Sequence, residues 1–221
     1  DLHGGDGPLQ VSDVGEETVI NRAMLAAGQE IGIPFNPDIN GRVQEGIGWH
    51  QASIGKGRRS STATAYLKPV RHRKNLDVQP EALVRRVLFD GKRAVGVEYD
   101  RSGSRHEARA GGAVILSGGA FASPQLLELS GIGDPARLQT LGIPVVHALP
   151  GVGENLQDHF AAHLRWRVKN ARTFNDRTRG LRAMAEGLNY ILRRKGVLTQ
   201  PTFAIAAYIR TRPELASPDV Q

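Results

Sequence analysis

Residues 114–133, VILSGGAFASPQLLELSGIG, combine an apolar run, a glycine pair and a Ser-Pro dipeptide. Glycine has no Cβ, so the backbone at Ser117-Gly118-Gly119-Ala120 can lie directly against a ligand. In open α/β sheets, ligands bind at the carboxyl ends of the parallel strands. The stretch therefore predicts a binding crevice, and from these residues alone close packing of a strand against a helix is an equal alternative.

The sequence lacks the motifs of several other catalytic and nucleotide-binding sites. No G-x-S-x-G nucleophile elbow is present, and Ser130 lies within E-L-S-G. There is no G-x-x-x-x-G-K-[ST] phosphate loop, and GVGENL at 151–156 ends in leucine with no buried strand before it, which indicates a turn. Cysteine is absent, which excludes disulfides, thiolate metal sites and cysteine nucleophiles.

Three polar residues suggest a metal site, and His50 suggests a substrate contact. His159 and His163 are four residues apart and follow Asp158, but neither an H-E-x-x-H motif nor an obvious third ligand accompanies them. The spacing would place the two histidines on one face, but the missing motif and third ligand favour structural, hydrogen-bonded histidines, and we expect no metal. His50, in GIGWHQ, faces either a substrate cavity or the surface, and a surface loop is favoured.

The formal charge of +7 raises the question of nucleic-acid binding. Nucleic-acid binders cluster Lys and Arg where they contact phosphates, and here KPVRHRKN at 68–75 forms only a weak cluster. Aromatic residues make up 5% and do not alternate with the basic ones, which disfavours a base-stacking platform. A solvated basic surface is favoured, and no nucleic-acid partner is expected.

Hydropathy and composition also bear on location. The longest apolar runs, near 113–116 and 203–209, have the length of strands, so no membrane span is expected. No basic-then-apolar leader opens the chain. The absence of cysteine permits a reducing compartment, and we expect a cytoplasmic protein.

The N-terminal third predicts helix and loop. Ser12 or Asp13 could cap a helix over 16–31, which ends at Gly32. Its apolar face would consist of Val19, Ile20, Ala23, Met24, Ala27 and Ile31. The glycine-rich stretch 36–59 predicts a loop, and a short helix over 61–67 should stop at Pro69.

The central part changes to the period of strands. We expect a short strand at 75–79 and a three-stranded antiparallel meander at 82–89, 93–100 and 105–110, with a hairpin at Asp90-Gly91. Residues 113–117, AVILS, are apolar on both faces, which is typical of a parallel strand covered by helices. Ser123-Pro124 predicts the start of a helix over 124–130.

The remaining elements complete the predicted fold class. These are a helix over 135–141, a strand at 161–167, a helix over 178–194 and a strand at 203–210. The fold class is therefore α/β around the centre with α+β flanks, arranged as two intertwined domains.

Six segments together resemble the glucose–methanol–choline (GMC) family of flavin oxidoreductases. In the family's second signature a pair of small residues is followed by Ser-Pro, two aliphatic residues and Ser-Gly-x-Gly, and each position is filled here. The segments, in family order, are HGGDGPLQV (3–11), GKGRRSSTATAYLKP (55–69), RKNLDV (73–78), DGKRAVGVEY (90–99), GAFASPQLLELSGIG (119–133) and LPGVGENLQDH (149–159).

The resemblance implies oxidation of a small-molecule alcohol by hydride transfer to FAD, with an electron acceptor that it leaves open. It implies that residues 71–143 form part of a Rossmann-like FAD-binding domain. Residues 1–70 would form a substrate-domain or FAD-lid segment, and 144–221 part of an α+β substrate domain. Val84 should lie beside the adenine through its backbone groups, and Ser117, Gly118, Gly119 and Ala120 should approach the dinucleotide.

The family's nucleotide-binding glycine motif and catalytic histidine have no counterpart in this sequence. We therefore expect a central piece of such an enzyme and assign no catalytic residue. Choline-oxidising members carry a carboxylate just after the Asp-His pair, whereas Asp158-His159 is followed by Phe160-Ala161, which favours a neutral alcohol. The alternatives are a non-catalytic domain for folding or partner binding and, less favoured, a basic nucleic-acid-binding domain.

Overall fold

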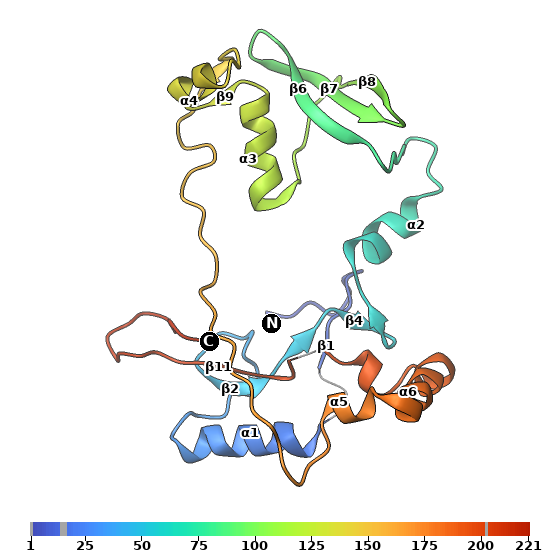
Figure 1. Ribbon diagram of the computed structural model, residues 1–221, viewed down its shortest axis with the longest axis vertical. Coiled ribbons are helices and arrows are strands. Elements are labelled where there is room, and N and C mark those ends of the chain that lie inside the picture. Colours follow the sequence, from blue (N-terminus) through green and yellow to red (C-terminus); the bar gives the residue numbers. More distant parts are fainter. Residues whose placement is uncertain (1, 14–16, 202) are drawn as a thin grey trace. The chain divides into compact units, whose positions relative to one another are not determined.

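The computed structural model describes residues 2–13, 17–201 and 203–221 (Figure 1). Contacts divide the chain into two compact units. One unit comprises residues 1–76 and 165–221, and the other comprises residues 77–164. The assignment of 1–70, 71–143 and 144–221 to cofactor and substrate domains stays a prediction.

A three-stranded antiparallel meander dominates the unit 77–164. Its strands are β6 (Leu83–Asp90), β7 (Arg93–Arg101) and β8 (Ser104–Arg109), in the order β6-β7-β8. Two-residue turns join them, because Asp90 pairs with Arg93 and Arg101 with Ser104. The meander predicted from the sequence is confirmed to within a residue or two at each end.

A β-bulge in β6 determines which side chains share a face. Val84 lies opposite Tyr99 and Arg86 lies opposite Glu98, so Arg85 is the extra residue. Residues three apart in a regular strand point to opposite faces. The bulge instead places Val84 and Val87 on the same face of the meander, where Val97 is the partner of Val87.

Helix α3 (Gly119–Leu129) packs against β6 and begins earlier than the sequence predicts. The expected N-cap and N1 pair, Ser123-Pro124, lies inside the helix, so that prediction is wrong. Gly118 is the N-cap residue, and its N–H donates to Oγ of Ser123 at 2.9 Å. Ser123 therefore ties down the start of the helix from its second turn.

Ser130 joins the end of α3 to the meander. Its Oγ accepts a hydrogen bond from the backbone N–H of Val87 at 2.8 Å and donates to the carbonyl of Leu126 at 2.5 Å. Both Ser130 and Val87 are buried. The serine thus satisfies a strand N–H that would otherwise be buried without a partner.

The chain after α3 forms a compact turn around Leu138. Strand β9 (Ile132–Gly133) pairs in parallel with β10 (His147–Ala148), and α4 (Pro135–Thr140) lies between them in sequence. Asp134 caps α4 by accepting the N–H of Arg137 at 2.8 Å. Leu138 is fully buried, and the helix predicted over 135–141 is confirmed.

Three predicted strands in this region are wrong. Residues 75–79, 113–117 and 161–167 are not in strand conformation. Hydrogen bonds to a neighbouring strand are what define a strand, and no described residue supplies them here. Segment 113–117 is consequently not the buried parallel strand we expected, and Ile115 is 85% exposed.

In the unit formed by residues 1–76 and 165–221, helix α1 (Val19–Glu30) packs on a two-stranded sheet. That sheet pairs β2 (Gly46–Trp49) antiparallel with β11 (Ile205–Tyr208), and α1 contacts both strands. Thr18 caps the helix by accepting the N–H of Asn21. The predicted caps and apolar face are therefore wrong, since Leu25 and Gly28 are the buried residues.

Short elements fill the stretch predicted as loop. Besides β2 they are β3 (Gln51–Ala52), which pairs with β1 (Ser12–Asp13), and β4 (Ile54–Gly55), which pairs with β5 (Arg58–Arg59). A π-helical turn, η1 (Ala63–Leu67), continues directly into α2 (Lys68–Val70). Pro69 lies within α2, so the helix does not stop there.

The C-terminal segment of this unit contains two helices and a 3₁₀ turn. They are α5 (Phe174–Arg177), α6 (Gly180–Arg193) and η2 (Val197–Thr199). Helix α6 agrees with the helix expected over 178–194, and β11 agrees with the strand expected at 203–210, whereas α5 and η2 were not predicted. No helix of the described residues is both long and apolar enough to cross a membrane.

Replacing Ser130 with alanine should destabilise the protein by about 1–3 kcal/mol, because it leaves the buried N–H of Val87 without an acceptor. Urea unfolding of the native protein measures the effect. Ser104→Ala, at an exposed strand end, is the matched control and should change little. Equal unfolding midpoints for the two variants would show that Ser130 does not hold β6.

The capping box of α5 should make stability depend on pH. The backbone N–H of Thr173 and then its hydroxyl hold the pKa of Asp176 below 3.8. The stabilisation is therefore present above that unfolded-state value and is lost as pH falls through the lower folded-state value. In acid titrations followed by circular dichroism, Asp176→Asn should remove this pH-dependent part of the stability. An acid transition that is the same in the variant would contradict the role of the capping box.

Candidate functional site

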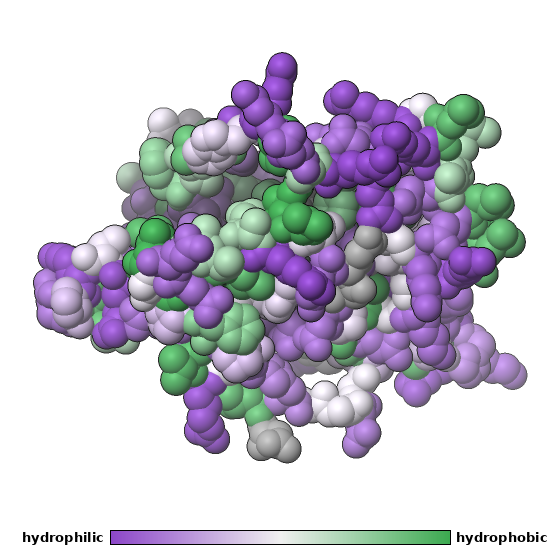
Figure 2. All heavy atoms as spheres, turned by 90° about the horizontal axis from the view of Figure 1, so that it is seen from below, coloured by the Kyte–Doolittle hydropathy of each residue, from purple (hydrophilic) through white to green (hydrophobic). Residues whose placement is uncertain are grey.

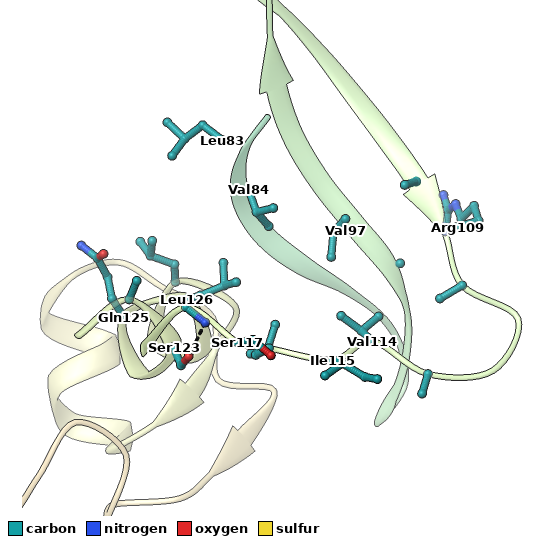
Figure 3. Close-up of a pocket in the computed structure, with 18 residues that line it drawn as sticks. Leu83, Val84, Val97, Arg109, Val114, Ile115, Ser117, Ser123, Gln125 and Leu126 are labelled. Carbon is teal, nitrogen blue, oxygen red and sulfur yellow. Dashed lines mark hydrogen bonds between the residues drawn. The ribbon is translucent and has the colours of Figure 1, made fainter. Parts of the chain in front are cut away.

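A cavity of about 570 Å³ lies within the unit 77–164 (Figure 3). Strands β6 and β7 form one wall, the extended segment 113–117 a second, and α3 a third. Val84 and Val97 reach it from the meander because the bulge at Arg85 places Val84 on this face. Its volume falls within the range of sites for cofactors and other small molecules.

The structure brings together three of the five residues that the resemblance proposes for cofactor binding. Val84, Ser117 and Gly118 all line the cavity, although Val84 is more than 30 residues away in sequence. Gly119 and Ala120 are not among its lining residues. Ala120 lines a neighbouring hollow formed with α3, Arg137 and residues 151–157.

The two glycines serve different purposes at this edge. A Cβ at Gly118 would lie 3.1 Å from the Cβ of Ala122 and 3.2 Å from the N of Ser123, so glycine permits a close approach of chain to helix. Gly119 has φ +83°, a left-handed conformation that L side chains adopt rarely, and open space surrounds it. The glycine pair therefore allows the backbone to turn sharply from the extended segment 113–117 into α3.

The lining of the cavity is apolar with a few polar groups. Val84, Val97 and Ile115 contribute aliphatic surface, as Figure 3 shows. Sequence reasoning missed Arg109 and Gln125, which are also among its lining residues, although the guanidinium of Arg109 donates to Glu107 on the same strand. Their positions at the end of β8 and on the cavity face of α3 follow from tertiary packing, so neither carries a local sequence signal.

A flat, mainly apolar group such as an adenine ring fits this lining. Aliphatic walls suit an aromatic heterocycle, and the missing Cβ at Gly118 leaves room near the start of α3. The helix start has no side-chain cap, and uncapped N–H groups at a helix N-terminus attract negative charge. The residues present are thus compatible with part of a dinucleotide.

Other predicted residues do not form a site. Asp158, His159 and His163 lie on an exposed extended segment, where Asp158 accepts the backbone N–H of His159 at 2.8 Å. Within residues 2–13, 17–201 and 203–221, no group of three His, Cys, Asp or Glu residues could hold a metal ion. The backbone N–H of His50 donates to the carbonyl of Ala204, which joins the ends of β2 and β11.

Comparison with known proteins identifies the family. The sequence profile of the GMC oxidoreductase family matches residues 5–161, which is more than half of the chain. The chain belongs to the GMC oxidoreductase family. This is a family of FAD-dependent oxidoreductases, so the resemblance inferred from the six segments is confirmed.

Two curated relatives are similar over the full chain. Mitochondrial choline dehydrogenase of Mus musculus is 45% identical over 218 residues, which cover 99% of this chain and 37% of that protein. Oxygen-dependent choline dehydrogenase of Pseudomonas putida is 46% identical over 226 residues, which cover all of this chain and 40% of that protein. The chain thus spans about two-fifths of the length of these relatives.

A solved structure supports the fold. An FAD-dependent oxidoreductase from Chaetomium thermophilum superposes with a TM-score of 0.81 and 27% identity, covering 93% of this chain and 37% of that one. The observed fold is therefore part of a GMC oxidoreductase, a mixed α/β arrangement with small antiparallel sheets.

Replacing Gly119 with alanine should destabilise the protein by about 1–2 kcal/mol, because the residue would have to keep a left-handed conformation. Thermal unfolding of the native protein measures the loss. Gly111→Ala is the matched control: a Cβ there meets nothing within 4 Å, and its φ is not in the left-handed region. Equal melting temperatures would contradict the strained entry into α3.

Proposed function

We propose that the protein oxidises an alcohol with FAD as its cofactor, and that residues 77–164 contact the adenosine part of FAD. The observation that carries the proposal is the meeting of Val84 with Ser117 and Gly118 around one apolar cavity. Membership of a family of FAD-dependent oxidoreductases supports it. FAD, when bound, supplies the acceptor for the hydride that leaves the carbinol carbon.

Each residue has a distinct part in holding the cofactor. Val84 and Val97 offer an apolar wall to a ring. Gly118 leaves space where a side chain would block close approach, and Ser123 keeps the start of α3 in place through the N–H of Gly118. Ser117, Gly119 and Ala120 stay proposed contacts of the dinucleotide.

The unpaired segment 113–117 suggests that this chain does not hold FAD alone. Tight pyrophosphate binding depends on N–H groups at a helix N-terminus after a glycine turn, and no such motif follows a strand in this sequence. We therefore propose that the catalytic base and the phosphate site lie in the part of the relatives that this chain does not cover. A cytoplasmic location stays a prediction.

We favour a neutral alcohol as substrate. Phe160 and Ala161 follow Asp158-His159, so no carboxylate is available there for a quaternary ammonium group. Choline is the second candidate substrate, because both curated relatives are named choline dehydrogenases.

The visible absorption spectrum of the full-length gene product, rather than of the 221-residue chain alone, tests the proposed function. Flavin bands should be present, heating should release FAD, and an alcohol should bleach the bands in the absence of an electron acceptor. Gly118→Val should lower the FAD content, because its side chain would project toward Ala122 and Ser123. A colourless protein that FAD does not reconstitute would leave the non-catalytic domain as the better proposal.

The 221-residue chain by itself should bind FAD weakly or not at all and show no turnover. Equilibrium dialysis of the purified chain against FAD measures this. Stoichiometric flavin on a chain of verified mass would show that it contains a complete site.

Substrate preference follows from the same preparation. Simple primary alcohols should bleach the flavin at lower concentration than choline does. A higher kcat/KM for choline would reject the neutral-alcohol proposal while leaving flavin-dependent alcohol oxidation intact.

A further inference from the structure

The cavity between the meander and α3 suits the faces of an adenine ring but not its edge. The faces of the ring are apolar, and Val84, Val97 and Leu126 offer aliphatic surface to them. The edge carries a 6-amino group beside a ring nitrogen, which are a hydrogen-bond donor and an acceptor. A polar group withdrawn from water without a partner costs binding energy, so the edge needs a polar side chain or backbone group.

Apolar side chains also reach the surface away from this cavity. On the face seen from below, Figure 2 shows them mixed with hydrophilic side chains. On α6, for example, Leu181 is 82% and Leu188 is 57% exposed. Those side chains lie on the outside of a single helix, whereas the cavity has walls from the meander, segment 113–117 and α3. Walls on several sides can hold both faces of a flat ring.

Two of the polar side chains that line the cavity already have partners. Among the lining residues that the structure describes, four side chains are polar: Arg109, Ser117, Ser123 and Gln125. The guanidinium of Arg109 donates to Glu107, and Oγ of Ser123 accepts the N–H of Gly118. Neither Ser117 nor Gln125 forms a side-chain hydrogen bond within residues 2–13, 17–201 and 203–221.

Gln125 lies at the rim of the cavity on α3. Ala122 and Leu129, on the adjacent turns of the helix, both line the cavity, so Gln125 shares their face. Its side chain is exposed and also lines the neighbouring hollow formed with residues 151–157. Figure 3 shows Gln125 beside Leu126 on the helix. The rim is where the polar edge of a ring held between apolar walls would emerge.

We propose that the carboxamide of Gln125 recognises the adenine base, by accepting a hydrogen bond from its 6-amino group and donating one to the neighbouring ring nitrogen. A carboxamide has one oxygen acceptor and one NH₂ donor side by side, and this pair matches adenine. The hydroxyl of Ser117 is a single group on a short side chain and does not offer that pair. The contact exists only if the cavity holds the adenosine part of FAD, as proposed above.

Binding of FAD and of an analogue that lacks the 6-amino group tests this contact. The full-length gene product, freed of its flavin, is dialysed to equilibrium against each dinucleotide. The native protein should bind FAD about fivefold more tightly than the analogue, because the analogue loses one neutral hydrogen bond. Gln125→Met should bind FAD about tenfold more weakly than the native protein. The variant should bind FAD and the analogue equally.

Gln139→Met is the matched control. Gln139 is an exposed glutamine on α4 in the same unit, and it is not a lining residue of this cavity. It should keep the native affinity for both dinucleotides. Glutamine and methionine have similar helix propensities, so both variants should keep the native melting temperature.

The ratio of the two affinities separates recognition of the base from a general effect on the cavity. If Gln125 contacts the 6-amino group, the preference for FAD over the analogue disappears in Gln125→Met. The same preference in the native protein and the variant would overturn the proposal, and so would unchanged FAD binding by the variant. A native protein that binds no FAD would overturn the proposed function as well, whereas the other two results leave that function intact.

Discussion

The hydrogen bond from the N–H of Val87 to Oγ of Ser130 fixes the relation between the meander and α3. A buried strand N–H must find an acceptor, and here the acceptor stands at the C-terminal end of a helix more than 40 residues later. This contact holds α3 beside β6. The space between them, closed by segment 113–117, is the cavity that we propose for the cofactor.

Two local irregularities give this cavity its lining. The bulge at Arg85 places Val84 on the same face as Val87, and the left-handed Gly119 lets the chain turn sharply into α3. Both departures from regular structure occur at the walls of one cavity. Such irregularities are often found next to binding sites, where they direct side chains and backbone toward a ligand.

Local sequence features predicted some elements well and others poorly. The strands on either side of Asp90-Gly91 pair with segments that are adjacent in sequence, so the meander was predicted closely. Ser123-Pro124 satisfies the rules for a helix start, yet the preceding glycine pair allows the helix to begin at Gly119. The six segments that include the motif at 119–133 were enough to predict the family, but the bulge that places Val84 at the cavity has no recognisable sequence signal.

The spacing of apolar residues shows which face of a strand or helix is apolar, but it does not show which segment packs against that face. Residues 113–117 and 161–167 have the patterns of strands and remain unpaired, because a ladder depends on a second segment. Residues 178–194 were likewise predicted as a helix, whereas the structure was needed to show that the face with Glu186 is the inner one. In both cases the sequence shows the pattern of side chains, but only tertiary contacts determine which segment each face packs against.

Hydrogen–deuterium exchange of the native protein, with and without bound FAD, tests most directly whether this cavity holds the cofactor. We predict that FAD slows exchange in peptides covering residues 83–97 and 113–126, with little change in residues 180–193. Protection by FAD elsewhere, with unchanged exchange in these two peptides, would show that the cavity between the meander and α3 is a packing feature and not part of the flavin site.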